Sequence, residues 1–363
     1  MILLGARVAQ GPDQAAALDI EIRSGKIHAL RNPSKPPKGA ATLDLGGCLI
    51  LPGLINAHDH LEFNLYPRLG RGPYPNAGAW ARDVYRPEES PVREQLAIPK
   101  NTRLLWGGLK NLLSGVTTVC HHNPREQAIF DRNFPVRVLK QFGWAHSLEF
   151  SPDVVERFQA TPPDWPFILH LGEGVDRAAQ REIFRLDELG ALDGRTVLVH
   201  AVALGARGLR LAKQRGAALI WCPSSNLFLL GRTLNGALSC RIPVALGSDS
   251  AVTAKGDLLD ELRVARRYVP APRLYGMVTA DAARILRLPH GFGAIVLGGP
   301  ADLLAIADNR RGPAESLLRA KRPEWVFVGG KVKLTTSPNP RLHRLSVKGR
   351  GEFFLAARAP VLE

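Results

Sequence analysis

The sequence predicts an α/β protein, namely a distorted TIM-type (β/α)8 barrel beside a small β-sandwich domain built from both chain ends. Three observations support this prediction. Short alternating apolar runs with turn signals fill about the first fifty residues and return after residue 293. Between them, nearly continuous apolar runs alternate with amphipathic stretches at a spacing of roughly 20–35 residues. Such runs are typical of strands buried on both faces of a parallel sheet, and their alternation with helices indicates βα units.

The two ends of the chain have the pattern of a β-meander. Residues 16–22 alternate with a period of two, and Ser24-Gly25-Lys26 predicts a turn before the next run. Near the other end, runs at 294–297, 301–306 and 325–332 are separated by Gly and Pro. We therefore expect the following division: 1–50 and 294–340 as the small β-sandwich domain, 51–293 as the barrel, and 341–363 as a basic C-terminal extension.

The middle of the chain supplies the strands and helices of the barrel. The predicted strands lie in the apolar runs 48–57, 116–119, 136–139, 167–169, 196–199, 218–221 and 243–246. The amphipathic stretches that predict helices are 101–114, 176–189, 207–215 and 257–267. The fourth strand either lies at 145–150, following the third without a helix, or is missing.

Composition and charge narrow the function classes. The chain has 363 residues, 45% of them hydrophobic and 22% charged, which excludes the disordered class. The formal charge is +15, and residues 310–363 hold 12 basic and 4 acidic residues, or +8 of it. A nucleic-acid-binding tail is one interpretation. We favour a solvated basic face, because no nucleic-acid-binding motif accompanies the charge.

The compartment predicted from the sequence is the cytoplasm. No run approaches the ~18 apolar residues that would span a bilayer, so we expect no membrane partner. The N-terminus lacks the basic and apolar regions of a signal peptide. Cys48, Cys120, Cys222 and Cys240 form no CxxC motif, which argues against a disulfide scaffold or a cysteine zinc site. We interpret Cys120 and Cys222 as buried thiols.

Several barrel runs end in residues that carry chemistry. The first ends in His58-Asp59-His60, and residues two apart on a strand face the same side. The later runs end in His170 with Glu173 nearby, in His200, and in Asp249. The carboxyl ends of barrel strands converge on one face, so these side chains should meet. Three imidazoles and a carboxylate suit a divalent ion such as Zn²⁺ with one position left for water. Each motif alone is more often structural, but their joint order indicates a metal centre.

These segments resemble the amidohydrolase superfamily of metal-dependent hydrolases. The likeness is to the branch with cytosine, adenosine, guanine and triazine deaminases and chlorohydrolases. The segments that carry it are 52–61, 115–118, 170–173, 199–200, 222–226 and 247–250, and in the small β-domain 299–303 and 328–332.

The resemblance implies that His58, His60, His170 and Asp249 bind one divalent metal ion, Zn²⁺ or alternatively Fe²⁺. A Glu three residues after the fifth-strand His marks the mononuclear deaminase type and makes Glu173 the proton shuttle. His200 would lie beside the metal-bound water or the substrate oxygen. The chemistry agrees, because a bound cation lowers the pKa of its water towards ~7. Asp249 can accept the water proton, Glu173 can protonate the leaving group, and His200 can stabilise an oxyanion.

We therefore expect a metal-dependent hydrolase of non-peptide carbon–nitrogen bonds that deaminates a small aminated heterocycle or cyclic amidine. The alternative within the superfamily is hydrolysis of an amide, a cyclic amide or a carbon–halogen bond. Two other classes are a non-catalytic barrel and a nucleic-acid-binding protein. The sequence leaves open whether the protein forms a homo-oligomer.

Three further features have two interpretations each. Lys140 could be the carboxylated lysine of binuclear relatives, but a structural or substrate-contact role is favoured. Of His121 and His122, at most one should face the substrate, because neighbours on a strand point to opposite faces. Residues 63–99 form either a lid that stacks on a flat ring and offers Arg to an anion, or a surface excursion packed by its own aromatic side chains.

Overall fold

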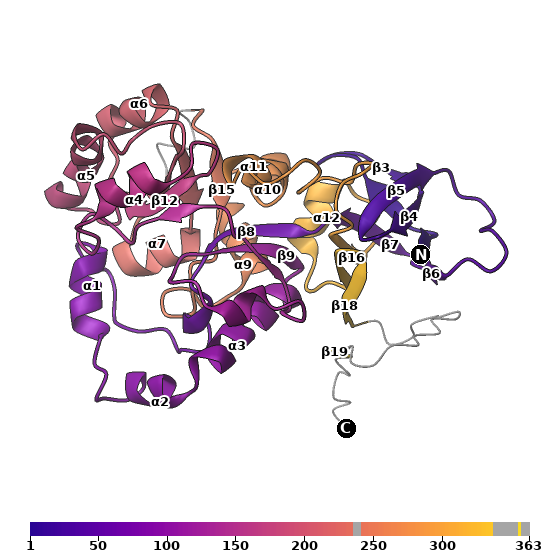
Figure 1. Ribbon diagram of the computed structural model, residues 1–363, viewed down its shortest axis with the longest axis horizontal. Coiled ribbons are helices and arrows are strands. Elements are labelled where there is room, and N and C mark those ends of the chain that lie inside the picture. Colours follow the sequence, from indigo (N-terminus) through magenta and orange to yellow (C-terminus); the bar gives the residue numbers. More distant parts are fainter. Residues whose placement is uncertain (235–240, 337–354, 357–363) are drawn as a thin grey trace.

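The computed structural model describes residues 1–234, 241–336 and 355–356. Figure 1 shows an elongated molecule with two parts. At one end, strands from the beginning and the end of the chain lie side by side. At the other end, helices surround strands from the middle of the chain.

Eight strands in the middle of the chain run parallel in two sheets. They are β8 (Leu54–Asp59), β9 (Val116–His121), β10 (Arg137–Val138), β11 (Gly143–Trp144), β12 (Phe167–Leu171), β13 (Thr196–His200), β14 (Ala218–Trp221) and β15 (Val244–Leu246). One sheet has the order β10-β9-β8 and the other β11-β12-β13-β14-β15. Past the ends of β8 and β15, the His60 N–H donates to the Asp249 carbonyl at 2.8 Å, and the Asp249 N–H donates to the His58 carbonyl at 3.1 Å.

The expected α/β order is present, but the described strands form no closed barrel, because no pairing joins β10 to β11. Both strands are only two residues long. The fourth strand follows the third without a helix, as one of the two alternatives predicted, but it lies at 143–144. Residues 145–150 form no strand.

The strands are buried on both faces, as their apolar runs predicted. Every residue of β8, β9, β12 and β13 is buried. In β12, Phe167 and Leu169 belong to the large core shared with the helices, whereas Ile168 packs in a second core. That second core includes Cys120, Val197, Val199, Ile220 and Cys222. Cys120 and Cys222 are buried thiols, as expected.

Helices follow most of these strands. They are α3 (Lys100–Leu113), α4 (Val154–Ala160), α5 (Arg177–Glu188), α6 (Ala206–Gln214), α7 (Pro223–Leu230), α9 (Leu258–Ala265), α10 (Ala271–Met277) and α11 (Ala280–Ile285), with the 3-10 turns η1 (Leu61–Phe63) and η2 (Gln127–Phe130). The four predicted helical stretches correspond to α3, α5, α6 and α9. Their starts are set by local hydrogen bonds: Asp176 caps α5, and Asp257 forms a capping box with Asp260 at α9.

Between β8 and α3 the chain forms a long excursion with two short helices. These are α1 (Ala77–Val84) and α2 (Val92–Ala97). Figure 1 shows both at the edge of the α/β part, away from the sheets of the chain ends. No helix in the described ranges is both long and apolar enough to cross a bilayer.

The chain ends contribute two sheets with a common core. One has the order β5-β4-β1-β6, and the other β19-β18-β17-β16-β7-β2-β3. Their bounds are β1 (Ile2–Leu4), β2 (Arg7–Ala9), β3 (Ala15–Ala17), β4 (Asp19–Arg23), β5 (Lys26–Arg31), β6 (Thr42–Asp44), β7 (Cys48–Pro52), β16 (Leu303–Ala307), β17 (Trp325–Val328), β18 (Lys331–Thr335) and β19 (Leu355–Ala356), with α12 (Pro313–Arg319) between β16 and β17. Leu3 and Ile20 of one sheet pack in the same core as Ile50 and Phe327 of the other.

Two details differ from the expected arrangement of this part. The run 294–297 forms no strand. This apolar run lies in a Gly-rich stretch in which Gly291 and Gly293 have positive φ. The chain turns there, and the run does not adopt the extended backbone of a strand. The domain boundaries stay a prediction, and β7 crosses the one at 50/51. The predicted basic extension 341–363 lies outside the described residues, except for the backbone of β19.

Candidate metal centre and active site

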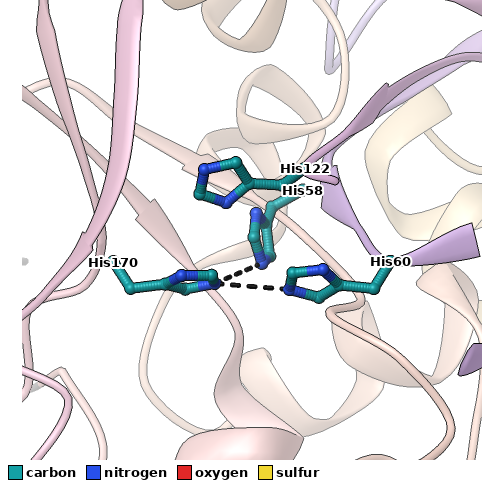
Figure 2. A group of neighbouring side chains, drawn as sticks. All are labelled: His58, His60, His122 and His170. Carbon is teal, nitrogen blue, oxygen red and sulfur yellow. Dashed lines mark hydrogen bonds between the residues drawn. The ribbon is translucent and has the colours of Figure 1, made fainter. Parts of the chain in front are cut away.

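Four predicted ligands converge beyond the carboxyl ends of three strands. His58 lies in β8 and His60 just after it, His170 lies in β12, and Asp249 follows β15. The Nε2 atom of His170 is 3.2 Å from His58 Nε2 and 3.3 Å from His60 Nε2. Asp249 Oδ1 is 3.6 Å from Nε2 of both His58 and His60. Figure 2 shows the three imidazoles with these nitrogens turned toward one another.

The spacing of these donor atoms suits a tetrahedral ion. Bonds of about 2.0–2.1 Å place neighbouring donors of a tetrahedral zinc site roughly 3.3–3.4 Å apart. The four distances in this protein are 3.2–3.6 Å. Burial lowers the pKa of His58 to about 3 and that of His170 well below its usual value, so both rings are neutral and keep a free lone pair. The donor set therefore fits one divalent metal ion.

Hydrogen bonds around the four groups fix their orientation. His60 Nδ1 is 2.9 Å from Asn123 Oδ1, and His170 Nδ1 is 2.8 Å from the His146 carbonyl. Both acceptors require a proton on Nδ1, which leaves Nε2 unprotonated. Asp249 Oδ2 accepts hydrogen bonds from Ser225 and Thr253 at 2.5 and 2.8 Å, so Oδ1 is the oxygen that faces the histidines. Such contacts orient ligands and raise their basicity.

Asp59, the residue between His58 and His60, fixes the end of β8 through its own hydrogen bonds. This residue between the two histidines is fully buried and accepts hydrogen bonds from Asn64 at 2.6 Å and Asn111 at 2.7 Å. The Ser248 hydroxyl donates to Asp59 at 3.2 Å, and the Asn56 amide donates to Ser248 at 2.7 Å. These contacts tie β8 to the loop that carries Asp249. The pairing of β8 with β9 also shifts register between Asn56 and Asp59, and such bulges re-aim side chains.

Glu173 and His200 face each other beside the metal ligands. Glu173 Oε1 is 3.4 Å from His200 Nε2. Burial and the nearby Asp249 carboxylate raise the pKa of Glu173 well above its usual value. Burial lowers the pKa of His200, although the Asp249 charge and the Asn226 hydrogen bond act in the opposite direction. Burial thus favours the uncharged form of both the Glu173 carboxyl group and the His200 imidazole.

The backbone is strained at two of these residues. His200 and Asp249 have φ of +71° and +59°, a region that non-glycine residues rarely adopt. Val197 and Val199 pack in the second core. Side chains alternate between the two faces of a strand, so a regular β13 would point His200 to the opposite face. We infer that the left-handed backbone brings His200 to the site. Strain of this kind is typical of functional sites held by the surrounding structure.

Comparison with known proteins agrees with this site. Residues 167–333 match the sequence model of the Amidohydrolase family. A 5-methylthioadenosine/S-adenosylhomocysteine deaminase of Syntrophobacter fumaroxidans is 27% identical over 335 residues, which cover 74% of each chain. A 5'-deoxyadenosine deaminase of Methanoregula boonei is 30% identical over 221 residues, covering 54% of this chain and 48% of the relative.

Over residues 167–333, the chain thus has the sequence of the amidohydrolase family. It is a hydrolase of non-peptide carbon–nitrogen bonds. Its fold is that of a zinc-complexed atrazine chlorohydrolase from Arthrobacter aurescens, with a TM-score of 0.74 at 20% identity over 95% of this chain and 97% of the other. An adenosine deaminase of Xanthomonas campestris with bound zinc gives 0.67 at 18% identity, over 92% and 93%.

Two histidines near the centre of this amidohydrolase had no assigned place in the predicted ligand set. His122 is buried, and its ligand atom lies within 4.8 Å of those of His58, His60 and His170. Its Nε2 is 3.0 Å from the Ala145 carbonyl, and its Nδ1 has no hydrogen-bond partner among the described residues. His121 points away, with Nε2 3.3 Å from Glu62. One of the pair therefore faces inward, as expected, but toward the metal ligands.

His146 is the second of these histidines. Its ring lies 4.7 Å from that of His170, and it lines the cavity above the ligands. The only sequence signal was its position just after the predicted start of the fourth strand. Lys140, in contrast, is exposed, and its Nζ lies 5.0 Å from the Phe130 ring. This surface contact favours a structural role for Lys140.

A cavity of about 680 Å³ opens above the ligands. His60, His170, Glu173, His200 and Asp249 form its polar floor. The segment 63–99 supplies much of its wall, so this excursion borders the site. Two arginines of that segment do not line the cavity: Arg68 stacks on Phe228 at 4.1 Å, and Arg71 lines a separate surface pocket with Tyr74.

Proposed function

We propose that this amidohydrolase removes the amino group of an aminated nitrogen heterocycle by hydrolysis, and that its ion is one zinc held by His58, His60, His170 and Asp249. The observation that carries the proposal is Glu173. A carboxyl group with a raised pKa faces the same cavity as three of the four metal donors, His60, His170 and Asp249, and it is not one of the donors. A proton donor beside a hydrolytic metal centre suits the departure of a basic nitrogen.

A divalent ion at this position would supply a water of lowered pKa as the nucleophile. Asp249 is the base nearest to that position. Its Oδ2 is occupied by Ser225 and Thr253, so Oδ1 is the atom that accepts the proton of the attacking water. The neighbouring His58 and His200 help to keep the pKa of Asp249 below its usual value despite burial, so the carboxylate is ionised and available.

Glu173 moves protons on the substrate. Its raised pKa favours the protonated form of its carboxyl group. It donates this proton to the ring nitrogen next to the reacting carbon, which makes that carbon more electrophilic. The resulting carboxylate then takes up the proton of the hydroxyl group that formed on that carbon and passes it to the leaving amino group, which departs as ammonia as the C=O bond forms. The proton that Asp249 took from the water then restores the acid form of Glu173.

His200 serves as the hydrogen-bond donor to the oxygen that forms on the substrate. This role needs a proton on Nε2, so Nδ1 must accept a hydrogen bond. Nδ1 lies 2.8 Å from the Asn226 side-chain amide, whose Nδ2 has no partner among the described residues when Oδ1 faces the ring. Exchanging the amide oxygen and nitrogen satisfies both groups, because Nδ2 then donates to Nδ1 and Nε2 keeps its proton.

The named relatives favour deamination over the alternatives. The Syntrophobacter and Methanoregula proteins carry the names of deaminases of adenine nucleosides. The likeness to the atrazine chlorohydrolase is one of fold, so it carries no weight for carbon–halogen cleavage. An amide or cyclic amide substrate would be hydrolysed by the same polar side chains at the cavity floor. The released product, ammonia or a carboxylic acid, distinguishes the two reactions.

The test combines metal analysis with a product assay. Purified protein should contain about one equivalent of zinc, and it should release ammonia from at least one of a panel of adenine, guanine, pterin and triazine derivatives. Metal content below about half an equivalent after mild purification would contradict the metal centre. Turnover that releases a carboxylic acid or chloride in place of ammonia would contradict deamination and support the alternative.

A further inference from the structure

The cavity above the ligands has walls of a different character from its floor. The side chains of the wall are apolar or aromatic and come from η1, α1, α2 and the loops beside them: Phe63, Tyr66, Leu69, Ala77, Trp80, Ala81, Val84, Tyr85, Val92, Leu96, Phe150 and Val252. The Trp80 indole N–H is already bonded to the Leu69 carbonyl at 3.0 Å, so its ring offers the cavity only apolar surface. Besides Arg82, the other polar lining residues outside the floor are His146, Ser250 and Thr253, so the space away from the floor is lined mostly by carbon.

The rim of this cavity keeps large apolar side chains in contact with water. Tyr85 is 67% exposed, Phe150 50% and Leu96 43%. All three line the cavity, and Tyr85 and Leu96 lie just after α1 and within α2. Clustered exposed apolar side chains are typical of a surface that binds an apolar ligand.

Charge is nearly absent from these walls. In the part of the chain that the structure describes, Arg82 is the one Lys or Arg that lines the cavity. It is 68% exposed and already paired with Glu149 at 3.1 Å. Arg68, the nearest alternative in the segment, stacks on Phe228. A carboxylate or phosphate bound here would lose its hydration without gaining an unoccupied cation, which is costly.

We propose that the substrate carries an uncharged apolar arm beside its aminated ring, and that this arm binds between α1, α2 and Phe150. The inference rests on the proposed deaminase function for the ring, but its evidence lies in the walls and not in the floor. It selects one class among the substrates that such a floor could accept. Compounds with an alkyl or alkylthio arm are preferred over those that end in a carboxylate, a phosphate or an amino acid.

The experiment uses pairs of compounds that share a ring. One member has an alkyl arm, and its twin has the same arm with a terminal carboxylate, on adenine, guanine, pterin and triazine rings. Methylthioadenosine and S-adenosylhomocysteine form a further pair. Ammonia release gives kcat/KM, and quenching of tryptophan fluorescence gives binding separately. We expect the apolar member to be preferred at least about 100-fold, and each added CH₂ to raise kcat/KM about fourfold until the cavity is full.

Variants at the rim link this preference to the walls. Leu96→Arg adds a cation where the side chain is already half exposed, so the fold should tolerate it. It should narrow the preference for the apolar member by about two- to fivefold. Leu96→Ala removes apolar contact without adding charge, and should weaken both members alike. Leu105→Arg on α3, equally exposed at 45% and outside the cavity, controls for the change in net charge.

The outcomes separate the two proposals. If the carboxylate twins are processed as well as the apolar ones, the inference is wrong while deamination stands. If no ring releases ammonia but the apolar members still bind more tightly, deamination is wrong and the apolar arm site is supported. If no compound is turned over and neither member of a pair binds more tightly, both proposals are wrong. An equal effect of Leu96→Arg and Leu105→Arg on the preference would also overturn the assignment of the arm to this rim.

Discussion

Replacing Glu173 by Gln separates proton transfer from metal binding. The two side chains are nearly isosteric, but the amide cannot donate and then take back a proton. Glu173 belongs to neither described group of metal-binding side chains, so the variant should keep the metal content of the parent. The Gln side chain can still contact His200 Nε2, which lies 3.4 Å from the present carboxyl oxygen, so the geometry of the site should persist.

The expected loss of turnover follows from the role of this single group. General acid–base catalysis by one positioned side chain is worth roughly 10²–10⁴-fold, or about 3–5 kcal/mol of activation free energy. Glu173 acts twice in the proposed reaction and is shielded from bulk water, so we expect the loss to lie at the upper end of this range. KM should change little, because binding of the substrate arm does not involve the carboxyl group.

The assay is steady-state ammonia release with metal analysis of the same samples. Glu156→Gln on α4 makes the same chemical change at an exposed position and should leave both quantities unchanged. Full turnover by the Glu173 variant would show that another group shuttles the proton, and the deaminase assignment would lose its main support. Loss of metal from the variant would mean that Glu173 is a ligand and that the donor set is wrong.

Three further changes test the site and the fold. His170→Ala should lose metal and activity together, because three donors hold the ion less tightly than four; metal retained after dialysis would contradict the donor set. His122→Ala should weaken zinc binding about 10–100-fold, measured by chelator competition, because a ring nitrogen of His122 lies within 4.8 Å of the ligand atoms of His58, His60 and His170; His121→Ala is the control, and equal zinc affinities of the two variants would refute the reasoning. Burial raises the pKa of Glu261 to about 8 in the folded state. Because the carboxyl ionises at a lower pH in the unfolded chain, the free energy of unfolding falls as pH rises from about 4.5 to 8. Glu261→Gln should therefore be more stable than the parent at pH 9, by up to about 4 kcal/mol in urea unfolding, with little difference at pH 4. A difference that does not change with pH would exclude this cause.

Sequence reasoning predicted the strands and the main donor set because both depend on simple periodicities. A strand buried on both faces must be apolar along its length, so the runs ending at His58, His170 and His200 were visible without any knowledge of the fold. His58 and His60 are two apart and share a face. The predicted helices matched for the same reason, since their amphipathic pattern and the caps Asp176 and Asp257 are local.

The remaining features depend on contacts that no local pattern encodes. Cys120 packs in the second core, so His122, two residues later, turns to the same side and His121 to the other. Only the packed structure shows which way Cys120 points. His146 follows β11, a strand of two residues that is too short to give a periodic signal. The left-handed backbone at His200 and Asp249 is not a preference of these residue types. Tertiary contacts impose it.

The donor set also has a consequence for the order of events in synthesis. His58 and Asp249 are about 190 residues apart in the chain, yet the backbone around them is joined by two hydrogen bonds past β8 and β15. At a ribosomal rate of roughly 5–20 residues per second, some 10–40 s separate the emergence of the first ligand from that of the last. A four-donor site cannot exist during this interval. The complete metal site therefore forms only after about two thirds of the chain has been made, and earlier folding must proceed without it.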